Sequence, residues 1–209
     1  IMKLMAPISR KLPSTAGTNS AKCAADAGAC TWALLLPMMA PCAPVDAVIV
    51  NASGCGTMLK DYGHLLRHDK AYAAKAAEIA ALSKDVTEFL TSYDLGAPKR
   101  WSSLRVAYHS ACSMQHGQRI TDEPKAILRK AGFTVLDVPE GHICCGSAGV
   151  YNILQPEIAG QLRERKLGNI EGLKPDLIAA GNIGCITHLQ SGTDTPVQHW
   201  VEMLDALLA

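Results

Sequence analysis

The amino-acid sequence predicts an α/β fold in which βαβ units form a parallel sheet, and three observations favour it. Hydrophobic residues make up 48% of the 209 residues and aromatic residues only 5%, so Ala, Leu, Ile and Val must build the core. That mixture suits layers of helices on a sheet better than an all-β sandwich. Short apolar runs alternate with segments of helical period, and one strand-and-turn unit occurs twice.

The first half of the chain divides into four segments. Residues 1–44 show no sustained helical or strand period. The run "VDAVIVNA" (45–52) predicts a short buried strand, followed by a Gly-Cys-Gly turn. Apolar residues at helical spacing predict one helix over 70–93, and a linker follows at 94–103.

The second half alternates regularly between the two kinds of element. Strands are predicted at 104–109, 133–138, 176–181 and 197–200. Helices are predicted at 122–132, at 156–172 and, as a short final helix, at 201–208. This alternation indicates a parallel sheet with right-handed crossovers. The charged run "RERK" (163–166) is interpreted as a solvated helix face.

An internal repeat sets the domain organisation. Residues 45–59 align without gaps on residues 175–189, so that Cys55 matches Cys185 and each copy is a strand that leads into a Gly-Cys turn. We therefore predict two pseudo-repeated domains. Residues 45–98 are the remnant of an incomplete first copy, and residues 99–209 are the second domain.

Composition excludes several classes of function. The net charge of +1 does not indicate a basic surface that binds nucleic acid. No apolar run is long enough to span a bilayer, and the longest, at 32–45, contains three prolines. The eight cysteines come without a secretory signal, so we expect a cytoplasmic protein whose clustered thiols bind metal or take part in redox chemistry.

Four cysteines follow the predicted strands of the second half. Cys112 comes after the strand 104–109, Cys144 and Cys145 come after 133–138, and Cys185 comes after 176–181. The carboxyl ends of parallel strands share one edge, so these thiols should converge. Four thiolates suit an iron–sulfur cluster or a zinc ion. Adjacent cysteines favour the cluster, because two neighbouring ligands on one tetrahedral zinc strain the backbone.

Other residues complete the expected site. Cys55 is a fifth metal candidate, whose partners should lie in residues 1–44. Gly146 and Gly184 allow close backbone approach, so their amides could donate hydrogen bonds to cofactor sulfides. Three histidines are left open as ligands, sulfur hydrogen-bond donors or space-fillers: His109, His142 and His188. Three cysteines are interpreted as small buried hydrophobic residues: Cys23, Cys30 and Cys42.

These residues resemble the cysteine-rich CCG domain family. Its pattern is a cysteine, a long gap, Cys-Cys-Gly, a similar gap and Cys-x-x-Cys, which Cys112, Cys144-Cys145-Gly146 and Cys185 fit. His188 stands where the last cysteine of the pattern would be, as in the glycolate oxidase branch of the family. Three stretches are similar to that branch almost word for word: "NASGCGTMLKDYGHLLRHD" (51–69), "CCGSAGVYNILQPE" (144–157) and "NIGCITHLQSGTDTPVQHW" (182–200).

The resemblance implies electron transfer during oxidation of glycolate to glyoxylate. It implies a 4Fe-4S type cluster, a partner subunit that bears flavin, and a quinone as acceptor. No catalytic base for glycolate is expected in this chain. It also implies a cytoplasmic location, with peripheral association at the inner face of the membrane left open. Two alternatives remain: a lactate-utilisation or heterodisulfide reductase-type protein, and a zinc-binding interaction module.

The resemblance covers residue 45 to the end of the chain. The family's full subunit also carries a ferredoxin-like part with Cys-x-x-Cys-x-x-Cys runs, and the sequence contains no such run. Residues 1–44 do not resemble the family, and the change at about residue 45 is abrupt. We hypothesise a frameshift upstream of that position, which translation of the gene in its other frames would test.

Overall fold

A computed structural model of the chain describes residues 45–97 and 102–208. From Ala47 onward the described residues belong to one compact unit. The frameshift hypothesis and the interpretation of the three early cysteines concern residues 1–44 and lie outside the described residues. The boundary expected at 98/99 stays a prediction.

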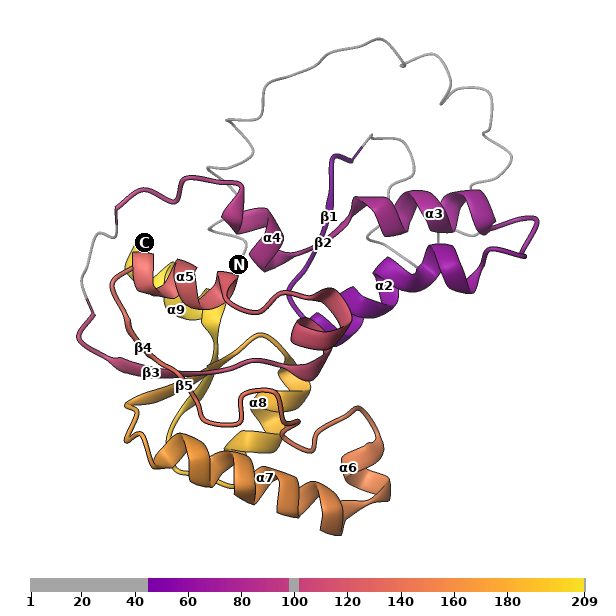
Figure 1. Cartoon of the computed structure of the whole chain (residues 1–209). Coiled ribbons are helices and arrows are strands. Elements are labelled where there is room, and N and C mark those ends of the chain that lie inside the picture. Colours follow the sequence, from indigo (N-terminus) through magenta and orange to yellow (C-terminus); the bar gives the residue numbers. More distant parts are fainter. Residues whose placement is uncertain (1–44, 98–101, 209) are drawn as a thin grey trace. The chain divides into compact units, whose positions relative to one another are not determined.

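A four-stranded parallel sheet lies at the centre of this unit (Figure 1). Its strands are β3 (Arg105–His109), β4 (Thr134–Leu136), β5 (Leu177–Ala180) and β6 (Val197–His199). Their order in the sheet is β4-β3-β5-β6, and every neighbouring pair is parallel. In the register, Val106 of β3 pairs with Val135 on one side and Leu177 on the other. The predicted α/β class with parallel strands is confirmed.

Helices cover both faces of this sheet. One apolar cluster joins it to α4 (Val86–Thr91), α5 (Glu123–Lys130) and α9 (Trp200–Leu208). The other joins it to the π-helical η2 (Ser113–Gln118), α7 (Pro156–Glu171) and α8 (Ile183–Gln190). Side chains alternate between the two faces: Val106 and Tyr108 belong to the first cluster, and Ala107 to the second. Burial on both faces explains why β5 and the centre of β3 are continuously apolar.

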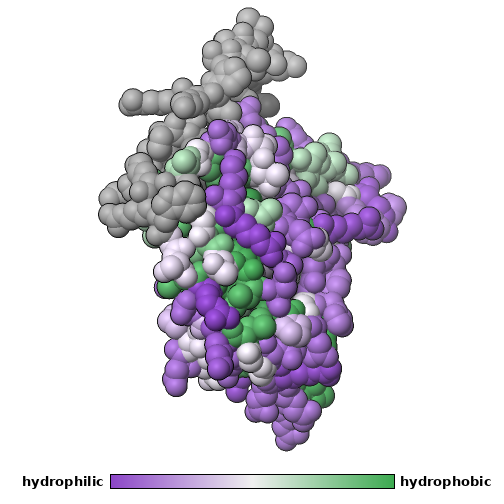
Figure 2. Space-filling model, turned by 60° about the vertical axis from the view of Figure 1, so that its left-hand side comes forward, coloured by the Kyte–Doolittle hydropathy of each residue, from purple (hydrophilic) through white to green (hydrophobic). Residues whose placement is uncertain are grey.

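The side that carries α5 and α9 leaves part of its apolar cluster at the surface. A small hollow there is lined mainly by Leu95, Ile127, Leu204 and Leu208. Figure 2 brings the left-hand side of Figure 1 forward and shows green hydrophobic residues exposed between purple hydrophilic ones.

The first half of the chain forms a smaller sheet of two parallel strands. These are β1 (Val48–Val50) and β2 (Ser83–Asp85), with α2 (Ser53–Leu65) and α3 (Ala73–Leu82) between them along the chain. The helix predicted over 70–93 is therefore wrong at its centre, where β2 separates α3 from α4. The expected Gly-Cys-Gly turn is also wrong, because Gly54, Cys55 and Gly56 form the first turn of α2.

Side-chain hydrogen bonds explain the break in that helix. The Ser83 hydroxyl donates to the carbonyl of Ile79, at the end of α3. Asp85 then begins α4 with a capping box: its carboxylate accepts from the amide of Thr87, and the Glu88 carboxylate accepts from the amide of Asp85, both at 2.8 Å. The Ser83 bond thus ends α3 and the Asp85 capping box starts α4, although apolar residues continue at helical spacing through both helices.

The internal repeat has a structural counterpart. β1 leads into α2 as β5 leads into α8, and Cys55 and Cys185 are each the third residue of their helix. The amino end of α2 contacts the residue that follows β5: the Ser53 amide donates to the carbonyl of Gly181 at 3.2 Å. The Ser53 and Ser113 hydroxyl oxygens are 2.8 Å apart, which joins α2 to η2.

None of the described helices combines the length and apolar character that crossing a membrane requires.

Candidate metal centre

The predicted thiols gather at the point where the strand order of the sheet reverses. From β3 the chain moves outward to β4, and from β5 it moves outward in the opposite direction to β6. The crevice beyond the carboxyl ends of β3 and β5 is where doubly wound sheets bind their ligands. Cys112 follows β3, Cys144 and Cys145 lie in the connection after β4, and Cys185 lies in α8 directly after β5.

The thiols form a continuous group. The Sγ atoms of Cys112 and Cys144 are 3.9 Å apart. The ligand atoms of His109, Cys145 and Cys185 all lie within 4.8 Å of one another, and these three residues are buried. Cys112 and Cys144 are partly buried. The structure therefore brings together the four cysteines expected from the strand ends and adds His109, the last residue of β3.

Four hydrogen bonds hold this group in place. The Gly146 amide donates to Cys144 Sγ at 3.3 Å. The Asn182 amide group donates to Cys185 Sγ at 3.5 Å. Gln115 of η2 donates through Nε2 to the carbonyls of Ser110 and Gly141, at 3.2 and 3.1 Å, and so ties the β3 loop to the β4 loop. The π-helical geometry of η2, which begins directly after Cys112, is a feature found often at functional sites.

Because the thiols lie close together, their pKa values shift in opposite directions. Hydrogen bonds from Cys112 and Cys145 lower the pKa of Cys144. A hydrogen bond from Cys145 lowers the pKa of Cys185 despite its burial. The same bonds, reinforced by burial, raise the pKa values of Cys112 and Cys145. Neighbouring thiols cannot all ionise together unless a cation replaces their protons, which is what a bound metal does.

Glycine is required where the Cys-Cys-Gly loop touches its neighbours. Gly146 has φ +96°, and a Cβ there would lie 2.4 Å from the carbonyl oxygen of Ala159 in α7. A Cβ at Gly184 would lie 2.8 Å from the Ser147 hydroxyl. Both glycines thus let the loop approach α7 and α8 closely. Cofactor contact by Gly146 and Gly184 stays a prediction, while the Gly146 amide already donates to a site sulfur.

Glu140 anchors the start of the same loop to α7. Its carboxylate accepts hydrogen bonds from Arg165, with Nε at 2.9 Å, and from Asn169 at 2.8 Å. These bonds lower the pKa of Glu140 to about 2. Its carbonyl accepts from Lys166 Nζ at 2.7 Å. The prediction that 163–166 is a solvated face is wrong for Lys166, which is 1% exposed.

The remaining candidates lie apart from the thiol group. Cys55 is exposed in the first turn of α2 and belongs to no three-ligand group among the described residues. His188 Nε2 contacts the carbonyl of Ala159 at 3.3 Å. His142 is exposed, and its carbonyl contacts His116. Metal binding by Cys55 stays a prediction, and His109 is the histidine that the structure places beside the thiols.

The donor set fits a soft metal centre. Thiols and one imidazole converge, and no carboxylate joins them in the part of the chain that the structure describes. His109 Nε2 is buried without a hydrogen-bond partner in that same part, so a ligand could use it. Thiolates select iron–sulfur clusters and zinc. The 3.9 Å spacing of Cys112 and Cys144 is also near the edge of a zinc tetrahedron, about 3.8 Å for 2.3 Å metal–sulfur bonds.

Comparison with known proteins gives consistent matches. The family described as "Cysteine-rich domain" (CCG) matches residues 106–190, which contain all four thiols. The glycolate oxidase iron-sulfur subunit of Escherichia coli K12 is 40% identical over 166 residues, covering 79% of this chain and 41% of that protein. A probable glycolate oxidase iron-sulfur subunit of Bacillus subtilis is 30% identical over 158 residues, covering 72% of this chain and 34% of that protein.

A third relative matches over most of its own length. Lactate utilization protein A of Oceanobacillus iheyensis is 30% identical over 166 residues, covering 75% of this chain and 68% of that protein. The chain thus spans less than half of the two glycolate oxidase subunits and about two thirds of the lactate utilization protein. From the thiol-bearing segment that the family pattern matches and from these relatives, the chain belongs to the cysteine-rich CCG domain family.

Proposed function

We propose that this chain is an electron-transfer part of a glycolate oxidase and that it holds a 4Fe-4S type iron–sulfur cluster. The convergence of Cys112, Cys144, Cys145 and Cys185 carries the proposal. The 40% identity to an iron-sulfur subunit of glycolate oxidase supports the substrate class. When bound, such a cluster accepts and releases single electrons.

The residues of this chain would bind, orient and insulate that cluster. The four cysteines supply the thiolates, and two adjacent ones can reach different metal atoms of a cluster. Asn182 and the Gly146 amide donate to the sulfurs of Cys185 and Cys144, which stabilises their thiolate forms. Cys145 and Cys185 are buried, so water is excluded from the inner side of the site. His109 is either a further ligand or a donor to a sulfur.

A protein partner follows from the electron-transfer role. We propose a flavin-bearing subunit that oxidises glycolate to glyoxylate and passes electrons to this chain, with a quinone as the onward acceptor. The short helix α6 (Tyr151–Leu154), which follows the Cys-Cys-Gly loop, supports a partner on this side. Its residues Ile153 and Leu154 are 74% and 69% exposed. Ile158, at the start of α7, is also exposed. Attachment at the inner face of the membrane remains part of the same proposal.

Two observations favour other functions enough to name them. The lactate utilization relative is covered over 68% of its length, which supports a different 2-hydroxy acid as substrate of the assembly. The 3.9 Å spacing of Cys112 and Cys144 supports a zinc-binding interaction module. Neighbouring genes for flavin oxidase subunits would favour glycolate over the first alternative.

Metal and acid-labile sulfide analysis of anaerobically purified protein tests the proposal. We expect iron and sulfide together, visible absorption, and a paramagnetic resonance signal on reduction. One zinc per chain without sulfide would instead establish the zinc alternative. Protein with neither metal, even after reconstitution with iron and sulfide, would exclude both.

A further inference from the structure

Lys166 is a buried cation on the inner face of α7. The residue is 1% exposed and lies on the helix face that also buries Leu167 and Ile170. A charged ammonium group inside a protein requires compensating charge or hydrogen bonds, because removing it from water is costly. Its one hydrogen bond in the described part of the chain goes to the carbonyl oxygen of Glu140, at 2.7 Å.

No carboxylate compensates this charge at short range. Within the described residues, no ion pair of 4.0 Å or less involves Lys166. The nearby Glu140 carboxylate is bound by Arg165 and Asn169, so Lys166 contacts only the backbone of that residue. Burial lowers the pKa of Lys166, and the acidic groups near it oppose this shift. Leu167 and Ile170, on the same buried face of α7, pack in one cluster with Cys145 and Cys185, so the ammonium lies on the side of the helix that faces the thiols.

We propose that Lys166 is a built-in countercation of the cysteine centre, which raises the reduction potential of the cluster bound there. The inference rests on the proposed function and deepens it. Reduction adds one electron, and thus one negative charge, to the cluster. A fixed positive charge in a buried, weakly screened position favours the reduced state. Lys166 acts through the cluster and is a positioning residue, not a catalytic one.

The geometry also explains why the cation sits on α7 and not in the cysteine loop. The loop that carries Cys144 and Cys145 begins at Glu140, whose carbonyl receives the ammonium. The hydrogen bond therefore fixes the loop to the helix and holds the charge beside the thiols at the same time. An exposed cation would act more weakly on the thiols, because water and salt would screen its charge.

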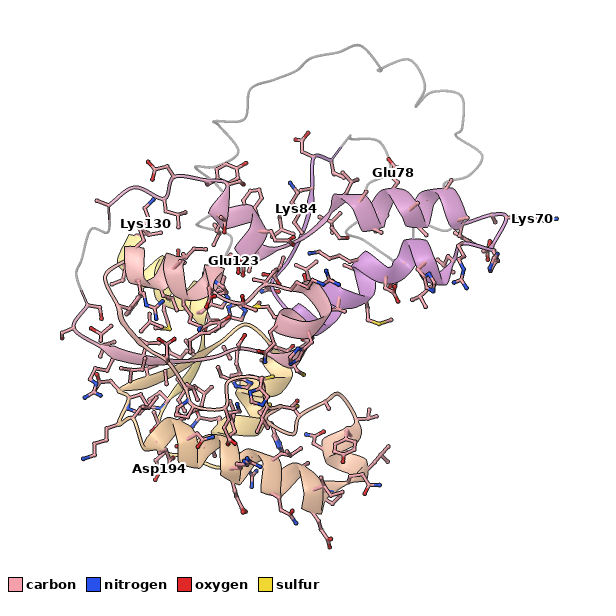
Figure 3. All side chains as sticks on the ribbon, in the orientation of Figure 1. Lys70, Glu78, Lys84, Glu123, Lys130 and Asp194 are labelled. Carbon is pink, nitrogen blue, oxygen red and sulfur yellow. The ribbon has the colours of Figure 1, made fainter. Side chains whose placement is uncertain are left out.

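The test compares the midpoint potential of the cluster in three variants of the whole chain. Lys166→Met removes the charge and retains the length of the side chain, and Lys166→Arg retains the charge. Lys130→Met is the matched control: Lys130 lies on α5, on the other face of the sheet from α7, and its side chain is 67% exposed (Figure 3). Potentials are read from the cluster's absorbance in a redox titration, without glycolate or partner.

We expect Lys166→Met to have a more negative midpoint potential than the parent, with Lys166→Arg and Lys130→Met near the parent value. Loss of the cluster in Lys166→Met but not in Lys166→Arg would also support the proposal, because it would show that the site needs the positive charge. A parent-like potential in Lys166→Met, or loss of the cluster in both Lys166 variants, would overturn the proposal. Iron and sulfide content of the parent tests the proposed function separately, so the two failures are distinguishable.

Discussion

Cys112 Sγ lies 3.9 Å from Cys144 Sγ, although 32 positions separate the two residues in the sequence. The sheet produces this contact. β3 and β4 are parallel neighbours, so the segments that follow them begin at the same edge. The bonds from Gln115 to the Ser110 and Gly141 carbonyls then hold these segments together.

Replacing any one of the four gathered cysteines should abolish or strongly reduce metal binding. We expect Cys112→Ala, Cys144→Ala, Cys145→Ala and Cys185→Ala to retain at most a small part of the parent's iron, because each removes one thiolate from a site that uses four. Cys55→Ala is the matched control, since Cys55 occupies the same helix position in the repeat but is exposed. Iron, zinc and sulfide per folded chain are the measurement.

The control makes this prediction specific. Metal loss in Cys55→Ala equal to that of the other four would mean that the centre includes α2 or that a second one exists. Full metal content in Cys112→Ala would instead assign the site to Cys144, Cys145, Cys185 and His109. Circular dichroism of each variant separates metal loss from unfolding.

A methyl group at Gly146 should displace the cysteine loop. Gly146→Ala places a Cβ 2.4 Å from the Ala159 carbonyl and forces alanine to φ +96°. Gly149→Ala is the matched control, with φ +63° and open space around its Cβ. We expect Gly149→Ala to cost about 1 kcal/mol of unfolding free energy from the backbone alone. Overpacking against backbone should bring Gly146→Ala to about 2–4 kcal/mol.

Urea unfolding and cluster content together check this comparison. Equal stability of the two alanine variants would contradict the close contact between the loop and α7. Lower cluster content in Gly146→Ala than in Gly149→Ala is expected even where both fold, because the displaced loop carries Cys144 and Cys145.

The parallel sheet and the convergence of thiols could be predicted because both depend on patterns along the chain. Apolar runs mark β3 and β5, which are buried on both faces, and cysteines follow their ends. β2 could not be found this way, because Ser83-Lys84-Asp85 has no apolar pattern and is specified by its pairing with β1. The signal that was present is Asp85 with Glu88 three residues later, a capping box that marks a helix start.

Lys166 shows a different limit. A lysine within "RERK" is indistinguishable by sequence from its solvated neighbours. The helix places Lys166 next to Leu167 on the buried side, and only the fold brings the Glu140 carbonyl to its ammonium group. His109 was visible as a histidine close to Cys112, but its distance from Cys145 and Cys185 depends on strand register.

Asp85 should make the stability of the fold depend on pH. Its side chain is fully buried, its Oδ2 has no hydrogen-bond partner among the described residues, and burial raises its pKa. A carboxyl whose folded pKa is raised disfavours the folded state once it ionises. This penalty is absent below the unfolded value of about 3.9 and grows as pH rises above it. Asp85→Asn removes the charge and retains the cap of α4.

We therefore expect Asp85→Asn to gain stability relative to the parent as pH rises from 4.5 to 8. Asp85→Ala should show the same gain with pH, because it also lacks the carboxyl, but offset by a loss of about 1 kcal/mol from the missing cap. Urea unfolding of the three proteins at both pH values is the measurement. An equal difference in unfolding free energy between Asp85→Asn and the parent at both pH values would contradict this prediction. It would mean that the pKa of Asp85 is the same in the folded and unfolded states.

Glu140 should rigidify the cysteine loop in a pH-dependent way. Its bonds to Arg165 and Asn169 hold the pKa of Glu140 at about 2, below its unfolded value of about 4.3. The sign is opposite to that of Asp85: the stabilisation is complete above the unfolded value and is lost as pH falls toward 2. Glu140→Gln should lack this loss, so the stability difference between it and the parent narrows on acidification.

The same contact makes a prediction at neutral pH. Glu140→Ala should speed hydrogen exchange of the Ile143 and Gly146 amides, because the loop loses its carboxylate anchor while Lys166 still holds the Glu140 carbonyl. Glu171→Ala is the control, since Glu171 is an exposed acid at the end of α7 that contacts Thr193 and not the loop. Unchanged exchange in Glu140→Ala would mean that the Lys166 bond alone fixes the loop. Faster exchange confined to that variant would separate the anchoring role of Glu140 from the electrostatic role proposed for Lys166.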